Sequence, residues 1–193
     1  MSLYSFGKPI VYAFYKIFFR ISVEGVENIP NEGGVLICSN HLSNFDPPLI
    51  GILIKRSLSF VAKEELFKIP FLGRLLRHLQ AFPIKRGSGD RGAIRTAMQL
   101  LRNGHALLIF PEGHRNPNAP LRQGLSGAGF FALKTDASII PCAIIGHYGF
   151  RERMKVVFGS PIDSDLLKRQ INKSSEASAV IMKHIQELLD RQQ

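Results

Sequence analysis

Cysteine is scarce in this sequence of 193 residues, and no spacing of cysteine and histidine suggests a metal site. Cys38 and Cys142 both lie in apolar, strand-like runs, and neither has a basic residue beside it. No secretory signal is expected, since the first seven residues carry no basic side chain and no small-residue cleavage site follows. We therefore expect two buried, reduced thiols and no disulfide, structural metal or cysteine nucleophile.

Acidic residues are also few, because 15 Asp and Glu stand against 25 Lys and Arg, which gives a formal net charge of +10. Most of the excess lies in residues 55–95, where ten basic residues meet three acidic ones for a net charge of +7. This concentration favours anionic lipid headgroups or an acidic carrier protein as partners, and the alternative is a solvated face. Nucleic acid is not expected as a partner, because the sequence has no zinc finger, stacking platform or recognition helix.

Length and apolar content limit the architecture to one domain. The chain has 45% hydrophobic residues and no repeat, low-complexity tract or linker. Strand-like runs alternate with helical stretches, which predicts a single α/β domain with a central, mostly parallel sheet flanked by helices. The strands are expected at residues 35–38, 58–61, 81–84, 106–110, 139–145 and 155–158, and the helices at residues 47–54, 90–102, 126–134 and 175–191.

Two short polar blocks each follow an apolar run, namely residues 40–47 (NHLSNFDP) and residues 110–115 (FPEGHR). On a continuous helix, His41 and Asp46 would lie about 140° apart around the axis, so they can meet only across a loop. Pro47 favours a helix start, with Asp46 as the expected N-cap. The carboxylate could then fix one imidazole nitrogen and leave the other as a general base. The alternative is an ordinary helix start beside a hydrogen-bonded loop histidine.

The second block places Glu112 and Arg115 around Gly113, at the end of the strand expected at residues 106–110. Open α/β sheets gather their ligand-binding groups at the carboxyl ends of strands, so these side chains are candidates for one site with His41. Taken alone, the block could be a polar turn with a surface ion pair. Together the two blocks predict a general base beside an anion-binding clamp.

Four blocks in this order resemble the glycerol-phosphate acyltransferase family, and within it the bacterial 1-acyl-glycerol-3-phosphate acyltransferases. They are residues 40–46, residues 63–66 with 82–86, residues 110–115 and residues 139–142. Each block is degenerate alone, but the ordered set is specific. The resemblance implies transfer of a fatty acyl group from acyl-CoA or acyl-carrier protein to the free hydroxyl of a lysophosphatidate. The product would be phosphatidic acid, and no cofactor would be needed.

The resemblance also implies roles for single residues. His41 would be the general base and Asp46 its orienting carboxylate. Glu112 would bind the acceptor's hydroxyl or position Arg115, and Gly113 would let the backbone turn close to the ligand.

The acceptor phosphate would be held by the guanidinium groups of Arg86, Arg115 and Arg122, and Gly124 would present backbone N–H groups to an anion. An apolar segment beside the basic residues could wall a groove for the acyl chain, or it could be ordinary core. Its members are Phe67, Ile69, Phe71, Leu72, Leu75 and Leu76.

Two departures from the family pattern leave the acceptor head group open. His114 and Asn116 stand where the family usually has Thr and Ser, in the turn that resembles its phosphate-binding loop. Another lysolipid, such as lyso-ornithine lipid, is the nearest alternative acceptor. A hydrolase with Ser39 or Ser43 as nucleophile is another, although the sequence has no Gly-x-Ser-x-Gly elbow. A non-catalytic membrane-binding module would leave the polar blocks unexplained.

Residues 9–21 are apolar almost all round, with only Lys16 and Arg20 interrupting them. As a helix they would be about 20 Å long, shorter than the roughly 30 Å hydrocarbon core of a bilayer. We expect an amphipathic helix in the membrane interface, with residues 1–22 as the membrane-binding segment and residues 23–193 as the acyltransferase domain. A helix packed on the sheet is the alternative. The interfacial helix predicts a peripheral or monotopic protein at the cytoplasmic face of the cell membrane.

Overall fold

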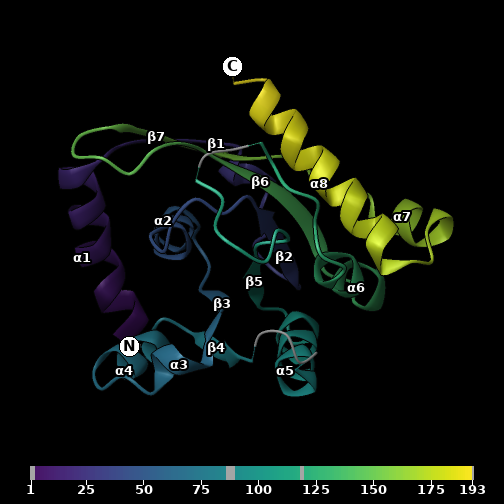
Figure 1. The fold of residues 1–193 in the computed structure, drawn as a ribbon, viewed down its shortest axis with the longest axis horizontal. Helices are drawn as coiled ribbons and strands as arrows, with labels where there is room; N and C mark the ends of the chain where they lie inside the picture. The colour runs from purple at the N-terminus through teal and green to yellow at the C-terminus, as the bar shows by residue number, and fades with distance from the viewer. Residues whose placement is uncertain (1–2, 86–89, 118–119, 193) are drawn as a thin grey trace.

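The computed structural model describes residues 3–85, 90–117 and 120–192 (Figure 1). In these residues seven strands form one sheet, in the order β1-β7-β6-β2-β5-β3-β4. Neighbouring strands run parallel, except that β6 and β7 are antiparallel. The strands are β1 Arg20–Glu24, β2 Val35–Ser39, β3 Leu58–Lys63, β4 Ala81–Ile84, β5 Ala106–Ile109, β6 Ser138–Gly146 and β7 Arg153–Phe158. The expected α/β fold with a mostly parallel central sheet is confirmed.

Helices cover both faces of the sheet, as Figure 1 shows. They are α1 Leu3–Phe18, α2 Asp46–Leu53, α3 Glu64–Phe67, α4 Leu72–His78, α5 Arg91–Arg102, α6 Gly127–Lys134, α7 Ser164–Gln170 and α8 Ser174–Asp190. In β2, Val35 and Ile37 pack with α1, α2 and α4, whereas Leu36 and Cys38 pack with α5, α6 and α8. The side chains of a strand alternate between its faces, so a continuous apolar run in the sequence supplies two separate cores.

The register of β2 and β5 brings the two polar blocks together. These strands are parallel neighbours, and Cys38 pairs with Ile109. The segments that follow them, residues 40–45 and 110–116, therefore leave the sheet side by side. This is the edge at which open α/β sheets bind their ligands.

The N-terminal segment differs from the prediction. The helix α1 ends at Phe18, and Arg20–Glu24 forms β1. The helix predicted over residues 9–21 is therefore confirmed for residues 9–18 and wrong for residues 19–21, and the boundary at residue 22 falls inside a strand. Four of the five β1 residues are exposed, so the sequence carries no apolar alternation there. Parallel pairing with β7 fixes this strand. The short helices α3, α4 and α7 were also not predicted.

The helix α1 is packed on one side and exposed on the other. Tyr15 is 2% exposed, and Val11 packs against the same cluster, whereas Ile10 and Ile17 are 67% and 60% exposed. Of the helices that the structure describes, none has the length and apolar content needed to cross a bilayer. One face of this helix therefore belongs to the core and the other presents apolar side chains outward, and its binding to a membrane interface stays a prediction.

Candidate active site

The side chains of His41 and Asp46 meet in the loop that follows β2. Nδ1 of His41 lies 2.7 Å from Oδ2 of Asp46, and Asp46 is fully buried. An ionised carboxylate only accepts hydrogen bonds, so Nδ1 carries the proton and Nε2 keeps its lone pair. Among the described residues Nε2 has no hydrogen-bond partner. This arrangement can accept a proton from a bound hydroxyl group.

Asp46 holds the loop and does not cap the helix. The helix α2 begins at Asp46 with Phe45 as its N-cap, so the expected N-cap was wrong by one residue. Pro47 has no N–H and neither does the residue after it, so the first turn offers few donors to a cap. Oδ2 of Asp46 instead accepts the backbone N–H groups of Leu42 and Ser43, each at 2.7 Å. These bonds fold the loop so that His41 faces the carboxylate.

The segment that follows β5, residues 110–116, holds His41 at three points. Phe110 stacks on the imidazole ring, with 3.8 Å between ring centroids and 11° between planes. The backbone N–H of His41 donates to Oε1 of Glu112 at 3.2 Å. The backbone N–H of Asn116 donates to the carbonyl oxygen of His41 at 2.6 Å. Both backbone polar groups of His41 are thus bound by residues that follow β5.

Glu112 is buried and serves as a tie within the protein. Its second oxygen accepts the Asn116 side-chain amide and the backbone N–H of Arg122, each at 3.1 Å. Asn116 also donates to the carbonyl oxygen of Pro120 at 2.7 Å. In the part of the chain that the structure describes, no ion pair joins Glu112 to Arg115, and a role of Glu112 toward the acceptor's hydroxyl or Arg115 stays a prediction. Hydrogen bonds to both oxygens compensate the burial of the carboxylate.

Each of the two glycines predicted in the site is closely approached by a neighbouring side chain. Gly113 has φ of +71°, and a Cβ atom there would lie 2.5 Å from Cδ1 of Leu125. A Cβ atom on Gly124 would lie 2.7 Å from Cγ of Met182. Gly113 therefore makes the expected tight turn. Gly124 packs against α8, and its anion-binding role stays a prediction.

Three side chains expected to bind the substrate, His114, Arg115 and Arg122, are exposed around the second block. The guanidinium groups of Arg115 and Arg122 form no ion pair with any residue that the structure describes, so both can bind an anion. Arg86 lies outside the described residues. Arg56, in the basic segment of residues 55–95, donates hydrogen bonds to two backbone carbonyl oxygens, at 2.9 and 2.7 Å. Its guanidinium group is therefore bound within the protein.

Tyr148, which follows β6, also belongs to the site and was not predicted. Its hydroxyl donates to Oδ1 of Asp46 at 2.6 Å. Burial, reinforced by the negative charge of Asp46, raises the pKa of Tyr148 far above its ordinary value, so the phenol stays protonated. Tyr148 lies 102 positions from Asp46, and a single tyrosine after an apolar strand carries no sequence signal.

The hydrolase alternative depends on the hydroxyl groups of Ser39 and Ser43. Ser39 is fully buried. The hydroxyl oxygen of Ser43 accepts the backbone N–H of Phe45 at 3.3 Å. No hydrogen bond between described residues joins either hydroxyl to His41, so neither is activated as a nucleophile in this arrangement.

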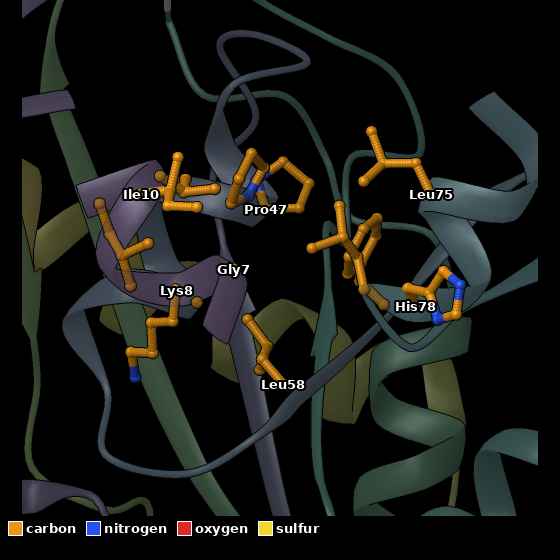
Figure 2. A pocket seen from close by; sticks show the side chains of 13 residues that line it. Gly7, Lys8, Ile10, Pro47, Leu58, Leu75 and His78 are labelled. Carbon is orange, nitrogen blue, oxygen red and sulfur yellow. The ribbon is translucent and has the colours of Figure 1, made fainter. Parts of the chain in front are cut away.

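An apolar pocket of about 250 Å³ lies between α1, α2, β3 and α4 (Figure 2). Pro47, which directly follows Asp46 in the chain, is among the residues that line it. Ile10, Leu58 and Leu75 contribute apolar walls from three other elements.

The segment predicted to wall an acyl groove reaches this pocket in part. Leu75 lines the pocket, whereas Leu76 is buried in the core. Ile69 and Phe71 are 48% and 86% exposed. Phe67 and Leu72 pack against the same core cluster as Leu76. Much of the segment is therefore ordinary core, and an acyl groove walled by Leu75 stays a prediction.

Comparison with known proteins identifies a family for this chain. The family model described as Acyltransferase matches residues 20–145. The 1-acyl-sn-glycerol-3-phosphate acyltransferase of Bacillus subtilis is 30% identical over 74% of this chain and 73% of its own length. The protein of the same name from Borreliella burgdorferi is 32% identical over 68% of this chain, which spans 53% of that relative.

A solved structure has the same fold. The crystal structure of the 1-acyl-sn-glycerophosphate acyltransferase PlsC from Thermotoga maritima aligns with a TM-score of 0.77 at 24% identity. The alignment covers 97% of this chain and 81% of that protein. The fold and the family match agree, and the chain belongs to the acyltransferase family.

Proposed function

We propose that this protein transfers a fatty acyl group from a thioester to the free hydroxyl of 1-acyl-glycerol-3-phosphate and so forms phosphatidic acid. The observation that carries the proposal is the buried contact between His41 and Asp46, which leaves Nε2 able to take a proton. The names of the Bacillus subtilis and Borreliella burgdorferi relatives support this acceptor.

In the proposed reaction, Nε2 of His41 removes the proton of the acceptor hydroxyl as its oxygen attacks the thioester carbonyl. The carbonyl π bond opens to an oxyanion, and the tetrahedral intermediate then collapses with cleavage of the C–S bond. The departing thiolate takes the proton back from His41. A thioester is already activated, so alignment and general-base catalysis suffice and no acyl-enzyme is formed. The carrier of the acyl group is acyl-CoA or acyl-carrier protein.

The phosphate of the acceptor would lie against Arg115 and Arg122. The backbone of Arg122 is held by Glu112, so the guanidinium group starts from a fixed point beside the same turn. Two exposed guanidinium groups match a dianionic phosphate better than the zwitterionic head group of a lyso-ornithine lipid. His114, exposed in the turn between Glu112 and Arg115, adds a third hydrogen-bond donor for the phosphate.

The acyl chain that is transferred would occupy the apolar pocket beside Pro47. Its volume of about 250 Å³ is just below the usual range for small-molecule pockets, which suits part of a chain. Leu75, on its rim, is 53% exposed and can be changed without opening the core. Leu75→Trp should shift the preferred donor to shorter chains and Leu75→Ala to longer ones. If both variants prefer the same donor chain lengths as wild type, the acyl chain does not bind in this pocket.

Membrane binding at the cytoplasmic face is proposed for the exposed side of α1. Ile10 and Ile17 project from this helix, and Phe14 is 41% exposed beside them. Lys16 lies one helical turn from Tyr12 with its amino group over the ring. Apolar groups flanked by cations suit an anionic lipid surface, where the lysolipid acceptor also resides.

The proposed function is tested by thiol release from acyl-CoA, with and without 1-acyl-glycerol-3-phosphate, and by detection of the lipid product. Wild type should release thiol only with acceptor, and His41→Ala should abolish release. His105→Ala changes an exposed histidine before β5 and is the matched control. Release without acceptor would indicate hydrolysis. Absence of release with both acyl-CoA and acyl-carrier protein as donors would refute the proposed reaction.

A further inference from the structure

The carboxylate of Asp46 is held unequally at its two oxygens. Oδ2 has three donors, namely Nδ1 of His41 and the backbone N–H groups of Leu42 and Ser43. Oδ1 has one donor within the described chain, the hydroxyl of Tyr148 at 2.6 Å. A carboxylate can rotate about its Cβ–Cγ bond, and a donor on each oxygen fixes that rotation.

The Tyr148 ring is itself locked by aromatic packing. Its centroid lies 5.4 Å from that of Phe19 in an edge-to-face arrangement and 5.5 Å from that of Phe45. Phe19 directly follows α1, and Phe45 is the N-cap of α2, so the ring is held between two helices. The hydroxyl of Tyr15 donates to the carbonyl oxygen of Phe45 at 2.6 Å, so it supports this packing and does not compete for Asp46. The position of the Tyr148 hydroxyl is therefore fixed before any substrate binds.

We infer that Tyr148 is a positioning residue, which sets the rotation of the Asp46 carboxylate so that Oδ2 faces Nδ1 of His41 and Nε2 faces the acceptor. The expected effect of Tyr148 on turnover rests on the proposed function. Its expected effect on the orientation of Asp46 and His41 does not. The phenol contacts neither donor nor acceptor and acts only through Asp46. It lies outside both polar blocks, on the connection between β6 and β7.

Tyr148→Phe tests this role, because it removes the hydroxyl and keeps the ring. Loss of a hydrogen bond to a charged group should lower kcat by about 10- to 100-fold, while the KM for the acceptor changes less than about twofold. Thr135→Val is the matched control. It removes a buried hydroxyl that donates to a backbone carbonyl of α6 at 2.8 Å, away from His41. Thermal denaturation of both variants shows whether each is folded.

A double-mutant cycle with Asp46→Ala separates positioning from a general structural effect. If Tyr148 acts through Asp46, the hydroxyl should matter in wild type and have no further effect on kcat in the Asp46→Ala background. An equal fold-loss in both backgrounds would overturn the inference.

Ring proton–nitrogen NMR spectra of the histidines give a readout that needs no activity, with His41 assigned by His41→Gln. In wild type the Nδ1 proton should be a slowly exchanging downfield signal, and Tyr148→Phe should shift or broaden it. If Tyr148→Phe changes this signal but the wild-type protein transfers no acyl group, the positioning role is upheld and the proposed function is refuted. A wild-type spectrum and wild-type kcat in Tyr148→Phe would overturn the inference even if the proposed function holds.

Discussion

The carboxylate of Glu112 accepts a hydrogen bond from the backbone N–H of His41 at 3.2 Å, across 71 positions of sequence. The other Glu112 oxygen binds two further donors, so this side chain ties the segment after β2 to the segment after β5. The tie makes the position of His41 depend on the second polar block.

Glu112→Gln should weaken this tie while keeping its shape. Glutamine has one accepting oxygen, so either the His41 N–H or the two donors at the other oxygen lose their acceptor. An unsatisfied buried donor costs about 1–3 kcal/mol, and we expect a lower melting temperature with kcat at least about tenfold lower. Thermal denaturation and thiol release measure these effects. Glu187→Gln, at a half-exposed position of α8, is the control, and identical behaviour of the two variants would contradict the tie.

The sequence could predict the contact between His41 and Asp46 because the two residues are close in the chain and a loop was required between them. It could not predict the bonds of Glu112, since these depend on β2 lying next to β5 in one particular register. Most strands were predicted, because buried strands of a parallel sheet are continuous apolar runs. The exposed edge strand β1 has no such run, and only its pairing with β7 makes it a strand.

Changes on the exposed face of α1 should weaken membrane binding without altering the fold. Ile10→Glu with Ile17→Glu replaces two outward apolar side chains by charges, which are repelled by an anionic surface. Sedimentation with phosphatidylglycerol-containing vesicles should show less bound protein, and a higher salt concentration should weaken wild-type binding. Ser175→Glu with Ala179→Glu makes the same charge change on exposed positions of α8, on the other face of the sheet. Equal loss of binding in both pairs would show that charge alone decides the result.

Arg115 should affect binding of the acceptor more than turnover. Arg115→Ala removes one of two exposed guanidinium groups and should raise the KM for lysophosphatidate about tenfold or more, with a smaller effect on kcat. Arg115→Lys keeps the charge but loses the bidentate fork, so an intermediate KM is expected. Steady-state kinetics with varied acceptor measures both. A kcat that falls as far as in His41→Ala, with KM unchanged, would assign Arg115 to the chemical step.

The two cysteines should be inert in the folded protein. Both are fully buried, and burial raises the pKa of Cys142 to about 12 and that of Cys38 still further. The thiolate is the reactive form and forms only near the raised pKa, so neither thiol should react at pH 8. Labelling with a chromogenic disulfide reagent should give no signal in buffer and two thiols per chain in guanidinium chloride. Rapid labelling of the native protein would show that these strands open readily.

His114 and Asn116, the two departures from the family pattern, should have separable effects. The Asn116 side chain donates to Glu112 at 3.1 Å and to Pro120 at 2.7 Å, and a serine hydroxyl has one proton and can replace only one of these bonds. Asn116→Ser should therefore cost about 1 kcal/mol of stability, visible as a lower melting temperature. His114 is exposed, so His114→Thr should leave the melting temperature unchanged and alter only the KM for the acceptor. If His114→Thr instead lowers the melting temperature and leaves the KM unchanged, His114 supports the turn and the acceptor phosphate is bound elsewhere.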